Sequence, residues 1–226
     1  MAAVISATPD ELTVSDLLER FGPIPISRIR MHPQPGTATE NDVVEIADHE
    51  DRLCELVDGI LLEKDMGFLE AWIAGRLVGL FHQYLDRFPL GIAVGDAGLM
   101  RLAPGLVRIP DVSFISWERM PGRRVPTDAI APFGPDLAVE VLSKGNTKKE
   151  MADKLVDYFE AGARLVWYID PKKATVTVYD SVDRATVLTG EDVLTGGDVL
   201  PGFAVPVKEL FAVPQAPTAS EGGAAV

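Results

Sequence analysis

The chain has 226 residues, enough for one full-sized hydrophobic core, and a formal net charge of −13. This charge argues against a general nucleic-acid coat protein, because such proteins bind by neutralising phosphates with Lys and Arg. No segment approaches the roughly 20 apolar residues of a membrane helix. The single cysteine, Cys54, rules out an intrachain disulfide and argues against a Cys-based zinc site. Because the N-terminus also lacks a basic leader, we expect a cytoplasmic protein with no membrane span.

The first 50 residues are expected to form an arm that packs on the core. A short helix with threonine at its start should end near Phe21 and Gly22, since threonine accepts from free backbone N–H groups and glycine closes a helix. The segment 22–50 is rich in proline, glycine and charge, which predicts irregular structure. The main domain is expected over 51–211, and the composition of 212–226 predicts a disordered tail.

Within the main domain, hydrophobic patterns predict a hairpin, a helix, three strands, a second helix and two further strands. The Asp58-Gly59 pair marks the hairpin turn, Pro89 stops the first helix, and Thr147 with Glu150 forms a capping box for the second. From helix to last strand, this order indicates an α/β fold with a mixed sheet flanked by helices. The expected ranges are 53–62, 67–88, 91–102, 107–116, 136–143, 147–162, 164–170 and 174–180.

Glu140 stands in the middle of an otherwise apolar strand, Leu137 to Ser143. Alternation puts Ala138, Glu140 and Leu142 on one face, and both faces are otherwise apolar, which predicts a central strand. An unpaired carboxylate in such a place costs several kcal/mol, so Glu140 requires a metal ion, a cation or a hydrogen-bond network. A metal ion and a buried ion pair with Lys or Arg are equally compatible with the sequence.

Two further residues are candidates for the same site. Asp111 opens another strand of the sheet, and adjacent strands lie about 4.8 Å apart, so its carboxylate could share a divalent ion with Glu140. Lys154 lies in the second turn of the helix after Thr147, and its side chain should tilt back toward Glu140, where it could orient a metal-bound water. The alternatives are a strand-start role for Asp111 and a solvated Lys154 that pairs with neighbouring helix carboxylates.

Five stretches form one pattern between about residue 10 and residue 211. They are Glu55–Gly59, Pro110–Ile115, Pro135–Ser143, Lys154 with Tyr158 and Gly162, and Val166–Pro171. The combination resembles the Uma-two family of restriction-endonuclease-like proteins, a branch of the PD-(D/E)XK nuclease superfamily. This resemblance implies a restriction-endonuclease-like fold, a nuclease site that depends on Mg²⁺ or Mn²⁺, DNA as substrate and a homodimer.

By motif position, the resemblance implies that Asp111 and Glu140 bind the metal and that Lys154 replaces a lysine expected at Leu142. Other lysines that could take this role are Lys144, Lys148 and Lys149. Glu70, on the first core helix, matches a place where the superfamily often carries a further acidic residue. The alternative is an ordinary exposed helix glutamate, whose negative charge is stabilised by the dipole at the N-terminal end of the helix.

Two functions from different classes follow. The first is a metal-dependent endonuclease that cuts DNA with a metal-activated water. The second is a catalytically inactive protein of the same fold that acts as a binding module, as suggested by the acidic charge, by Leu142 and by the lack of a histidine near Glu70, where many relatives have one. The segment 101–126 has a local surplus of positive charge, which indicates either a basic groove or a solvated loop.

Overall fold

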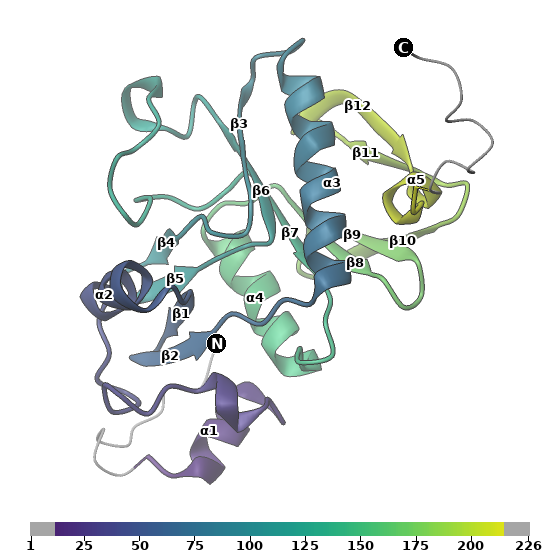
Figure 1. Ribbon diagram of the computed structural model, residues 1–226. Helices are drawn as coiled ribbons and strands as arrows, with labels where there is room; N and C mark the ends of the chain where they lie inside the picture. Colours follow the sequence, from purple (N-terminus) through teal and green to yellow (C-terminus); the bar gives the residue numbers. More distant parts are fainter. Residues whose placement is uncertain (1–11, 215–226) are drawn as a thin grey trace, which may run out of the picture.

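The computed structural model describes residues 12–214 (Figure 1). A six-stranded sheet in the order β10-β9-β8-β7-β6-β3 forms its centre. Strands β7 and β8 run parallel, whereas the other neighbouring pairs are antiparallel. The strands are β3 (Gly91–Val94), β6 (Val112–Ser116), β7 (Leu137–Val141), β8 (Leu165–Asp170), β9 (Thr175–Ser181) and β10 (Arg184–Thr189). The mixed sheet confirms the predicted fold class.

Two helices cover the two faces of this sheet. Helix α3 (Phe68–Leu85) packs through Ile73, Leu77 and Phe81 on the face that contains Val139 and Trp167. Helix α4 (Lys148–Glu160) makes the crossover from β7 to β8 and packs on the opposite face, so the two helices sandwich the sheet (Figure 1). Because side chains alternate along β7, its odd-numbered residues face α3, and Ala138 and Glu140 face α4.

A second, four-stranded sheet has the order β2-β1-β5-β4. Its strands are β1 (Cys54–Val57), β2 (Ile60–Glu63), β4 (Met100–Ala103) and β5 (Leu106–Arg108). The hairpin of β1 and β2 is as predicted, with both turn residues, Asp58 and Gly59, at positive φ.

The strands expected over 91–102 and 107–116 are each divided in two, the first at Gly95 and Gly98, two glycines that indicate a bulge or bend in the sequence. The first divides into β3 and β4 around a turn at Gly95–Gly98, and the second divides into β5 and β6 at Pro110. Proline has no N–H to donate to a strand ladder, so pairing is interrupted there. One half of each predicted strand therefore joins the central sheet and the other half joins the second sheet.

The N-terminal segment contains more regular structure than the sequence predicted. Helix α1 (Val14–Phe21) begins with a capping box of Thr13 and Asp16 and ends at Gly22, as expected. The 3-10 helix η2 (Ile26–Arg28) follows. Helix α2 (Glu40–Glu50) corrects the prediction of an irregular segment over 22–50; it has its own capping box and packs on the second sheet through two buried residues.

The C-terminal part adds elements that no sequence pattern had indicated. These are β10, the hairpin of β11 (Val193–Gly196) and β12 (Leu200–Pro206), and α5 (Val207–Phe211). Phe203 in β12 packs edge-to-face on Phe81 of α3 at 5.1 Å, so this hairpin completes the core. The predicted leader-free N-terminus and most of the predicted tail lie outside the described residues. No helix within 12–214 has the length and apolarity to cross a membrane.

Candidate active site

Glu140 is buried in β7, at 4% exposure, and is held by two donors from α4. Lys154 Nζ donates to its Oε1 at 3.1 Å, and the Tyr158 hydroxyl donates to the same oxygen. The other oxygen, Oε2, accepts no hydrogen bond from the part of the chain that the structure describes. The buried charge predicted from the sequence is therefore ion-paired on one side and has a free acceptor on the other.

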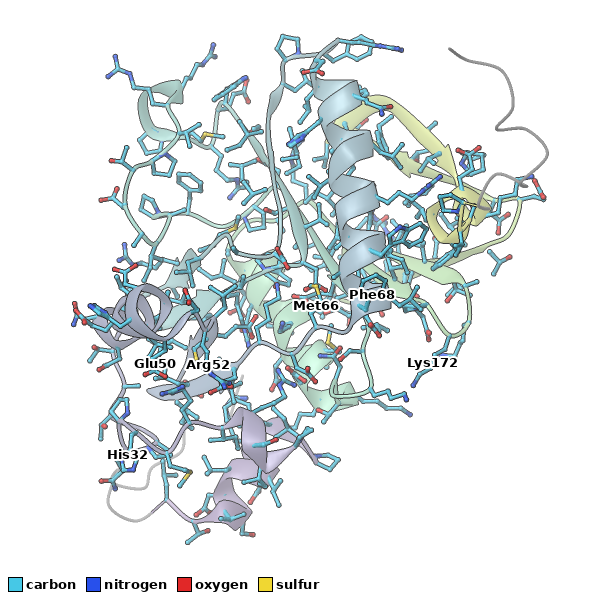
Figure 2. The ribbon with its side chains drawn as sticks, viewed as in Figure 1. His32, Glu50, Arg52, Met66, Phe68 and Lys172 are labelled. Atoms are coloured by element: carbon cyan, nitrogen blue, oxygen red, sulfur yellow. The ribbon has the colours of Figure 1, made fainter. Side chains whose placement is uncertain are left out.

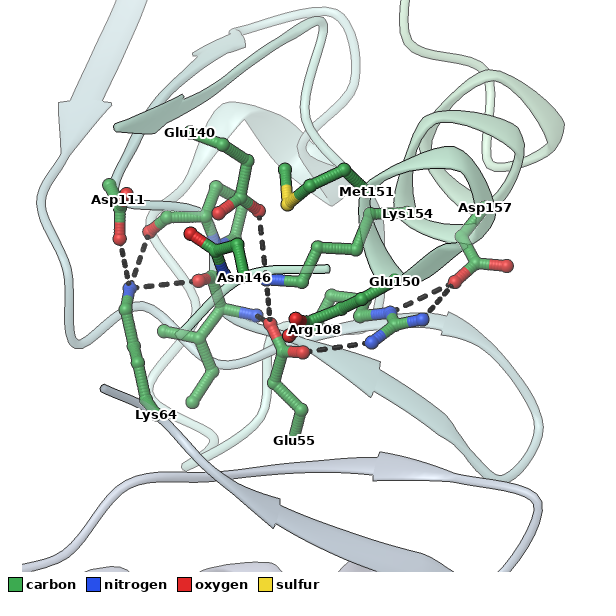
Figure 3. A network of polar contacts seen from close by, with 12 residues as sticks. Glu55, Lys64, Arg108, Asp111, Glu140, Asn146, Glu150, Met151, Lys154 and Asp157 are labelled. Carbon is green, nitrogen blue, oxygen red and sulfur yellow. Dashed lines mark hydrogen bonds and ion pairs between the residues drawn. The ribbon is translucent and has the colours of Figure 1, made fainter. Parts of the chain in front are cut away.

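Lys154 points into the protein and not into solvent. The capping box of Thr147 and Glu150 begins α4, which puts Lys154 in its second turn on the face that covers the sheet. Its Nζ lies 2.8 Å from Glu55 Oε1 as well as 3.1 Å from Glu140 Oε1 (Figure 3). The alternative of a solvated lysine that pairs along the helix is wrong.

Asp111 lies just before β6 and is fixed beside Glu140 by two bonds. Its Oδ2 accepts from the backbone N–H of Val141 at 2.6 Å, and Val141 directly follows Glu140. Its Oδ1 is 3.0 Å from Lys64 Nζ. Figure 3 shows Asp111 and Glu140 in one polar network. Asp111 is 5% exposed, and its position directly before β6 is also that of the strand-start role considered as the alternative.

Glu55 and Arg108 also belong to this network, although the sequence analysis gave them no role. Arg108 Nη1 lies 2.8 Å from Glu55 Oε2, and Arg108 also binds Asp157 of α4 at 2.6 Å. The backbone N–H of Ile109 donates to Glu55 Oε1 at 3.2 Å. Glu55 carries the same signal that identified Glu140, a carboxylate inside an apolar strand, and could have been found in that way.

Lys64, in the link between β2 and α3, supplies a second cation that the sequence did not reveal. Besides Asp111, its Nζ donates to the carbonyl oxygens of Ile109 at 2.9 Å, Asp96 at 3.2 Å and Pro110 at 3.3 Å. These four oxygen acceptors surround one ammonium group, so the part of the site next to Asp111 is arranged around a positive charge. Nothing in the local sequence marks Lys64, because its acceptors are mostly main-chain atoms.

The network separates the pKa values of its two buried glutamates. Burial, with the charges of Asp111 and Glu55, raises the pKa of Glu140 to about 7, although Lys154 acts in the other direction. For Glu55, burial also disfavours the charge, but Lys154 and Arg108 outweigh it and lower the pKa to about 2. A separation of this kind is typical of sites that hold and move protons.

Other candidates from the sequence are not part of the network. Glu70 is partly exposed in the first turn of α3 and makes no hydrogen bond or ion pair within residues 12–214. Lys144 and Lys148 are exposed and unpaired in the described chain, and Lys149 lies 3.4 Å from Asp153. None of these three lysines bonds to Glu140 or Asp111, so of the lysines named from the sequence only Lys154 reaches Glu140.

Asp136, which follows Pro135 directly before β7, is held in place by backbone and side-chain partners. Asp136 accepts from the backbone N–H of Ser116 at 2.8 Å and lies 3.3 Å from both Arg119 and Arg164. Burial opposes its ionisation, but the Ser116 bond and Arg119 hold the pKa of Asp136 below its usual value. These bonds fix the start of β7. Because Arg119 is engaged here, and Arg101 and Arg108 pair with Glu40 and Glu55, the segment 101–126 does not form a basic groove of five free arginines.

The donor set suits a divalent cation bound in part by water or substrate. Among residues 12–214, no group of three or more His, Cys, Asp or Glu side chains is placed to hold a metal ion. An ion at Asp111 and Glu140 would therefore also use main-chain oxygens, water or a phosphate, which is how Mg²⁺ is commonly bound. The free Oε2 of Glu140 and the oxygens gathered around Lys64 Nζ fit this requirement.

Comparisons with known proteins identify the family and the fold. The sequence model of the Uma2 family, described as "putative restriction endonuclease", matches residues 41–208. A crystal structure described as a "putative nuclease belonging to DUF820", from Anabaena variabilis, has a TM-score of 0.63 at 20% identity, over 71% of this chain and 90% of that chain. This likeness shows a common fold. No curated protein matches the sequence. Because the family match spans most of the sequence, the chain belongs to the Uma2 family.

Proposed function

We propose that this protein is a metal-dependent endonuclease that hydrolyses phosphodiester bonds of DNA. The observation that carries the proposal is the position of Lys154 Nζ, 3.1 Å from Glu140 Oε1, in a network that also holds Asp111. A metal ion held by carboxylates can activate water for phosphoryl hydrolysis, and a lysine beside it can stabilise the charge that develops. Membership in the Uma2 family supports the same reaction class.

Asp111 and Glu140 would hold Mg²⁺ or Mn²⁺ through their carboxylate oxygens. When bound, such an ion stabilises charge on a phosphate and lowers the pKa of a coordinated water. The Val141 N–H keeps the Asp111 carboxylate turned toward β7. The Lys154 and Tyr158 donors keep Glu140 Oε1 on the α4 side, which leaves Oε2 as the available ligand.

Lys154 contributes a fixed positive charge. A lysine ammonium has three N–H donors, and the bonds to Glu140 and Glu55 use two of them. The third is available to orient a water or to stabilise charge on a phosphate oxygen. Glu55 acts through Lys154, and Arg108 in turn fixes Glu55, so both are positioning residues.

Substrate must reach groups that are at most 5% exposed. The link between β2 and α3 contains Lys64, which contacts Asp111, and the first residue after the link, Phe68, is 91% exposed (Figure 2). We infer that displacement of Lys64 from Asp111 opens the site to a phosphate. We also propose a homodimer, since two sites are needed to cut both strands of a duplex in one encounter; analytical ultracentrifugation tests this.

The test is cleavage of supercoiled plasmid DNA with Mg²⁺, with Mn²⁺ and with EDTA. We expect nicking that needs a divalent ion and that falls by at least about 100-fold in Asp111→Asn and Glu140→Gln, since each removes a metal ligand. Asp136→Asn is the matched control, because it makes the same change at the other Pro-Asp pair, at the far end of β7. Equal loss in all three variants, or cleavage without a divalent ion, would contradict the proposal.

One observation favours the second function, a binding module without catalysis. Asp111, Glu55 and Glu140 are already paired with protein cations, namely Lys64, Arg108 and Lys154. Carboxylates that already have cationic partners in the protein have less need of a metal ion. Titration calorimetry with Mg²⁺ separates the two functions: a binding isotherm that disappears in Asp111→Asn supports the nuclease, and its absence in the wild-type protein supports the binding module.

A further inference from the structure

A pocket of about 500 Å³ opens beside the candidate active site. It begins with Leu142, two residues beyond Glu140 on the chain, and is lined by the start of α4 and by β8 and β9. Two residues of strand span about 7 Å, and Tyr168 of the lining is the partner of Glu140 in the pairing of β7 with β8, so the pocket adjoins the position of Glu140 in the sheet. The volume falls in the usual range for small-ligand sites. The proposed reaction uses none of the side chains that line the pocket.

The inner surface of this pocket is apolar and partly aromatic. Leu142, Met151 and Leu155 line it together with Tyr168 and Tyr179. The two tyrosine rings meet edge to face at 5.2 Å. The Tyr168 hydroxyl donates to the Met151 carbonyl at 2.6 Å, whereas the Tyr179 hydroxyl has no hydrogen bond within the described residues. Tyr179 is only partly buried, so its ring offers a surface on which a planar group can stack.

Free positive charge gathers at the rim. Most of the 21 Lys and Arg residues, all of which lie within 12–214, form ion pairs, in keeping with the net charge of −13. Lys148 and Lys172 line the pocket, and Lys144 lies in the loop between Ser143 and Asn146, which also line it. The residues without a carboxylate partner are Arg76, Arg87, Arg123, Arg124, Lys144, Lys148 and Lys172.

The one acidic residue in the lining does not cancel this charge. Asp170 is bound by Lys173 Nζ at 2.8 Å and by the backbone N–H groups of Lys172 at 3.0 Å and Lys173 at 3.2 Å. Figure 2 shows the Lys172 side chain extending from the turn between β8 and β9. An apolar, aromatic interior with free ammonium groups at its edge matches a ligand that has a flat ring and an anionic backbone.

We propose that this pocket binds one nucleotide of the substrate strand, next to the phosphate that is cut. The base stacks on Tyr179, and Lys148 and Lys172 contact the flanking phosphates. This assignment rests on the proposed nuclease function, because it is the strand at Glu140 that brings a nucleotide to the pocket. The two lysines give this acidic protein a local positive charge that can bind a polyanion.

The test measures binding of a fluorescein-labelled single-stranded oligonucleotide by anisotropy, in EDTA, over a series of salt concentrations. The double variant Lys148→Gln with Lys172→Gln should lower the slope of log affinity against log salt by about 1.4, or about 0.7 for each phosphate contact. Tyr179→Ala should weaken binding on the order of tenfold, through loss of stacking.

The matched control is Arg123→Gln with Arg124→Gln, which removes the same charge from two other unpaired cations. They follow β6, and β6 is antiparallel to β7, so they lie at the opposite end of the sheet from the pocket. Equal loss of slope in both double variants would overturn the proposal. So would the absence of oligonucleotide binding by the wild-type protein. In a competition measurement, displacement of the oligonucleotide by dTMP as effectively as by an unlabelled strand would also overturn it. The binding assay contains no metal and is therefore independent of cleavage. A lysine-dependent slope without plasmid cleavage in Mg²⁺ would overturn the nuclease function but would still show that the pocket binds a strand.

Discussion

Lys154 Nζ lies between Glu55 Oε1 at 2.8 Å and Glu140 Oε1 at 3.1 Å. Glu55 belongs to the second sheet and Glu140 to the central sheet, so one ammonium group joins the two sheets at the candidate site. Both carboxylates are buried, and their attraction raises the pKa of Lys154 in spite of its own burial. A cation in this position has a structural role and a proposed chemical one. Unfolding of a variant without the cation measures the structural role.

Lys154→Met should destabilise the protein by about 3–5 kcal/mol, because it leaves buried carboxylates without their shared cation. Urea unfolding at neutral pH measures this change in the free energy of unfolding. Lys149→Met is the control: it is exposed on the same helix and forms a longer pair at 3.4 Å, so it should change stability by less than about 0.5 kcal/mol. A loss below about 1 kcal/mol in Lys154→Met would show that the two carboxylates do not depend on this cation for their burial.

Lys64→Met should change how the protein responds to a divalent ion. Loss of the ammonium leaves Asp111 Oδ1 and three carbonyl oxygens with one donor fewer each, at an expected cost of about 1–3 kcal/mol. If Mg²⁺ binds at Asp111, the ammonium no longer competes with it, and the Mg²⁺-dependent rise in Tm should be larger in the variant than in the wild-type protein.

Thermal melts with Mg²⁺ and with EDTA check this expectation. Lys208→Met is a suitable control, since it removes one lysine from an exposed pair with Glu191, in α5. If Mg²⁺ raises Tm equally in the wild-type protein and in Lys64→Met, then the Lys64 ammonium does not compete with Mg²⁺ for Asp111.

The contact of Lys154 with Glu140 could be predicted because it follows from local rules. The alternation of β7 sets the face of Glu140, and the capping box fixes where α4 begins and therefore where Lys154 lies. Lys64 could not be predicted, since its acceptors include carbonyl groups of three different residues that only the tertiary fold brings together. The catalytic roles of Asp111, Glu140 and Lys154 remain predictions.

The second sheet was missed for a similar reason. Pairing of β1 with β5, at Leu56 and Val107, joins segments about fifty residues apart, and periodicity does not tell which sheet a strand joins. Helix α2 was missed because only Val43 and Ile46 are buried in it, so its apolar stripe is too short to separate from a charged loop.

Gly91→Ala should weaken the central sheet. A Cβ at Gly91 would lie 2.0 Å from the Ile115 carbonyl oxygen, which is a backbone atom and cannot easily move. We expect a loss of about 1–3 kcal/mol or more from this overpacking at the start of β3. Gly79→Ala is the matched control, because a Cβ there meets nothing within 4 Å and alanine favours a helix. It should stabilise the protein by about 0.5–1 kcal/mol. Similar unfolding curves for the two variants would contradict the steric argument.

Glu140→Gln should alter the pH dependence of stability. The pKa of Glu140 is about 7 in the folded protein against a reference of 4.5, so between these values the unfolded chain binds fewer protons than the folded one. Stability from this group is therefore full below about pH 4.5 and is lost as pH rises through about 7, by about 3 kcal/mol in total. Glutamine cannot ionise, so the variant should gain stability relative to the wild-type protein across this window.

Glu55→Gln should show the opposite trend with pH. The two variants together therefore test the direction in which each glutamate makes stability depend on pH. The pKa of Glu55 is lowered from 4.5 to about 2, so its contribution to stability is full above about pH 4.5 and is lost as pH falls toward 2. Urea unfolding of the wild-type protein and both variants between about pH 2 and pH 8 covers the windows of both groups and measures the differences. If the Glu140→Gln difference does not change between pH 4.5 and pH 7, then Glu140 is ionised throughout, and Lys154 and Tyr158 compensate its burial fully.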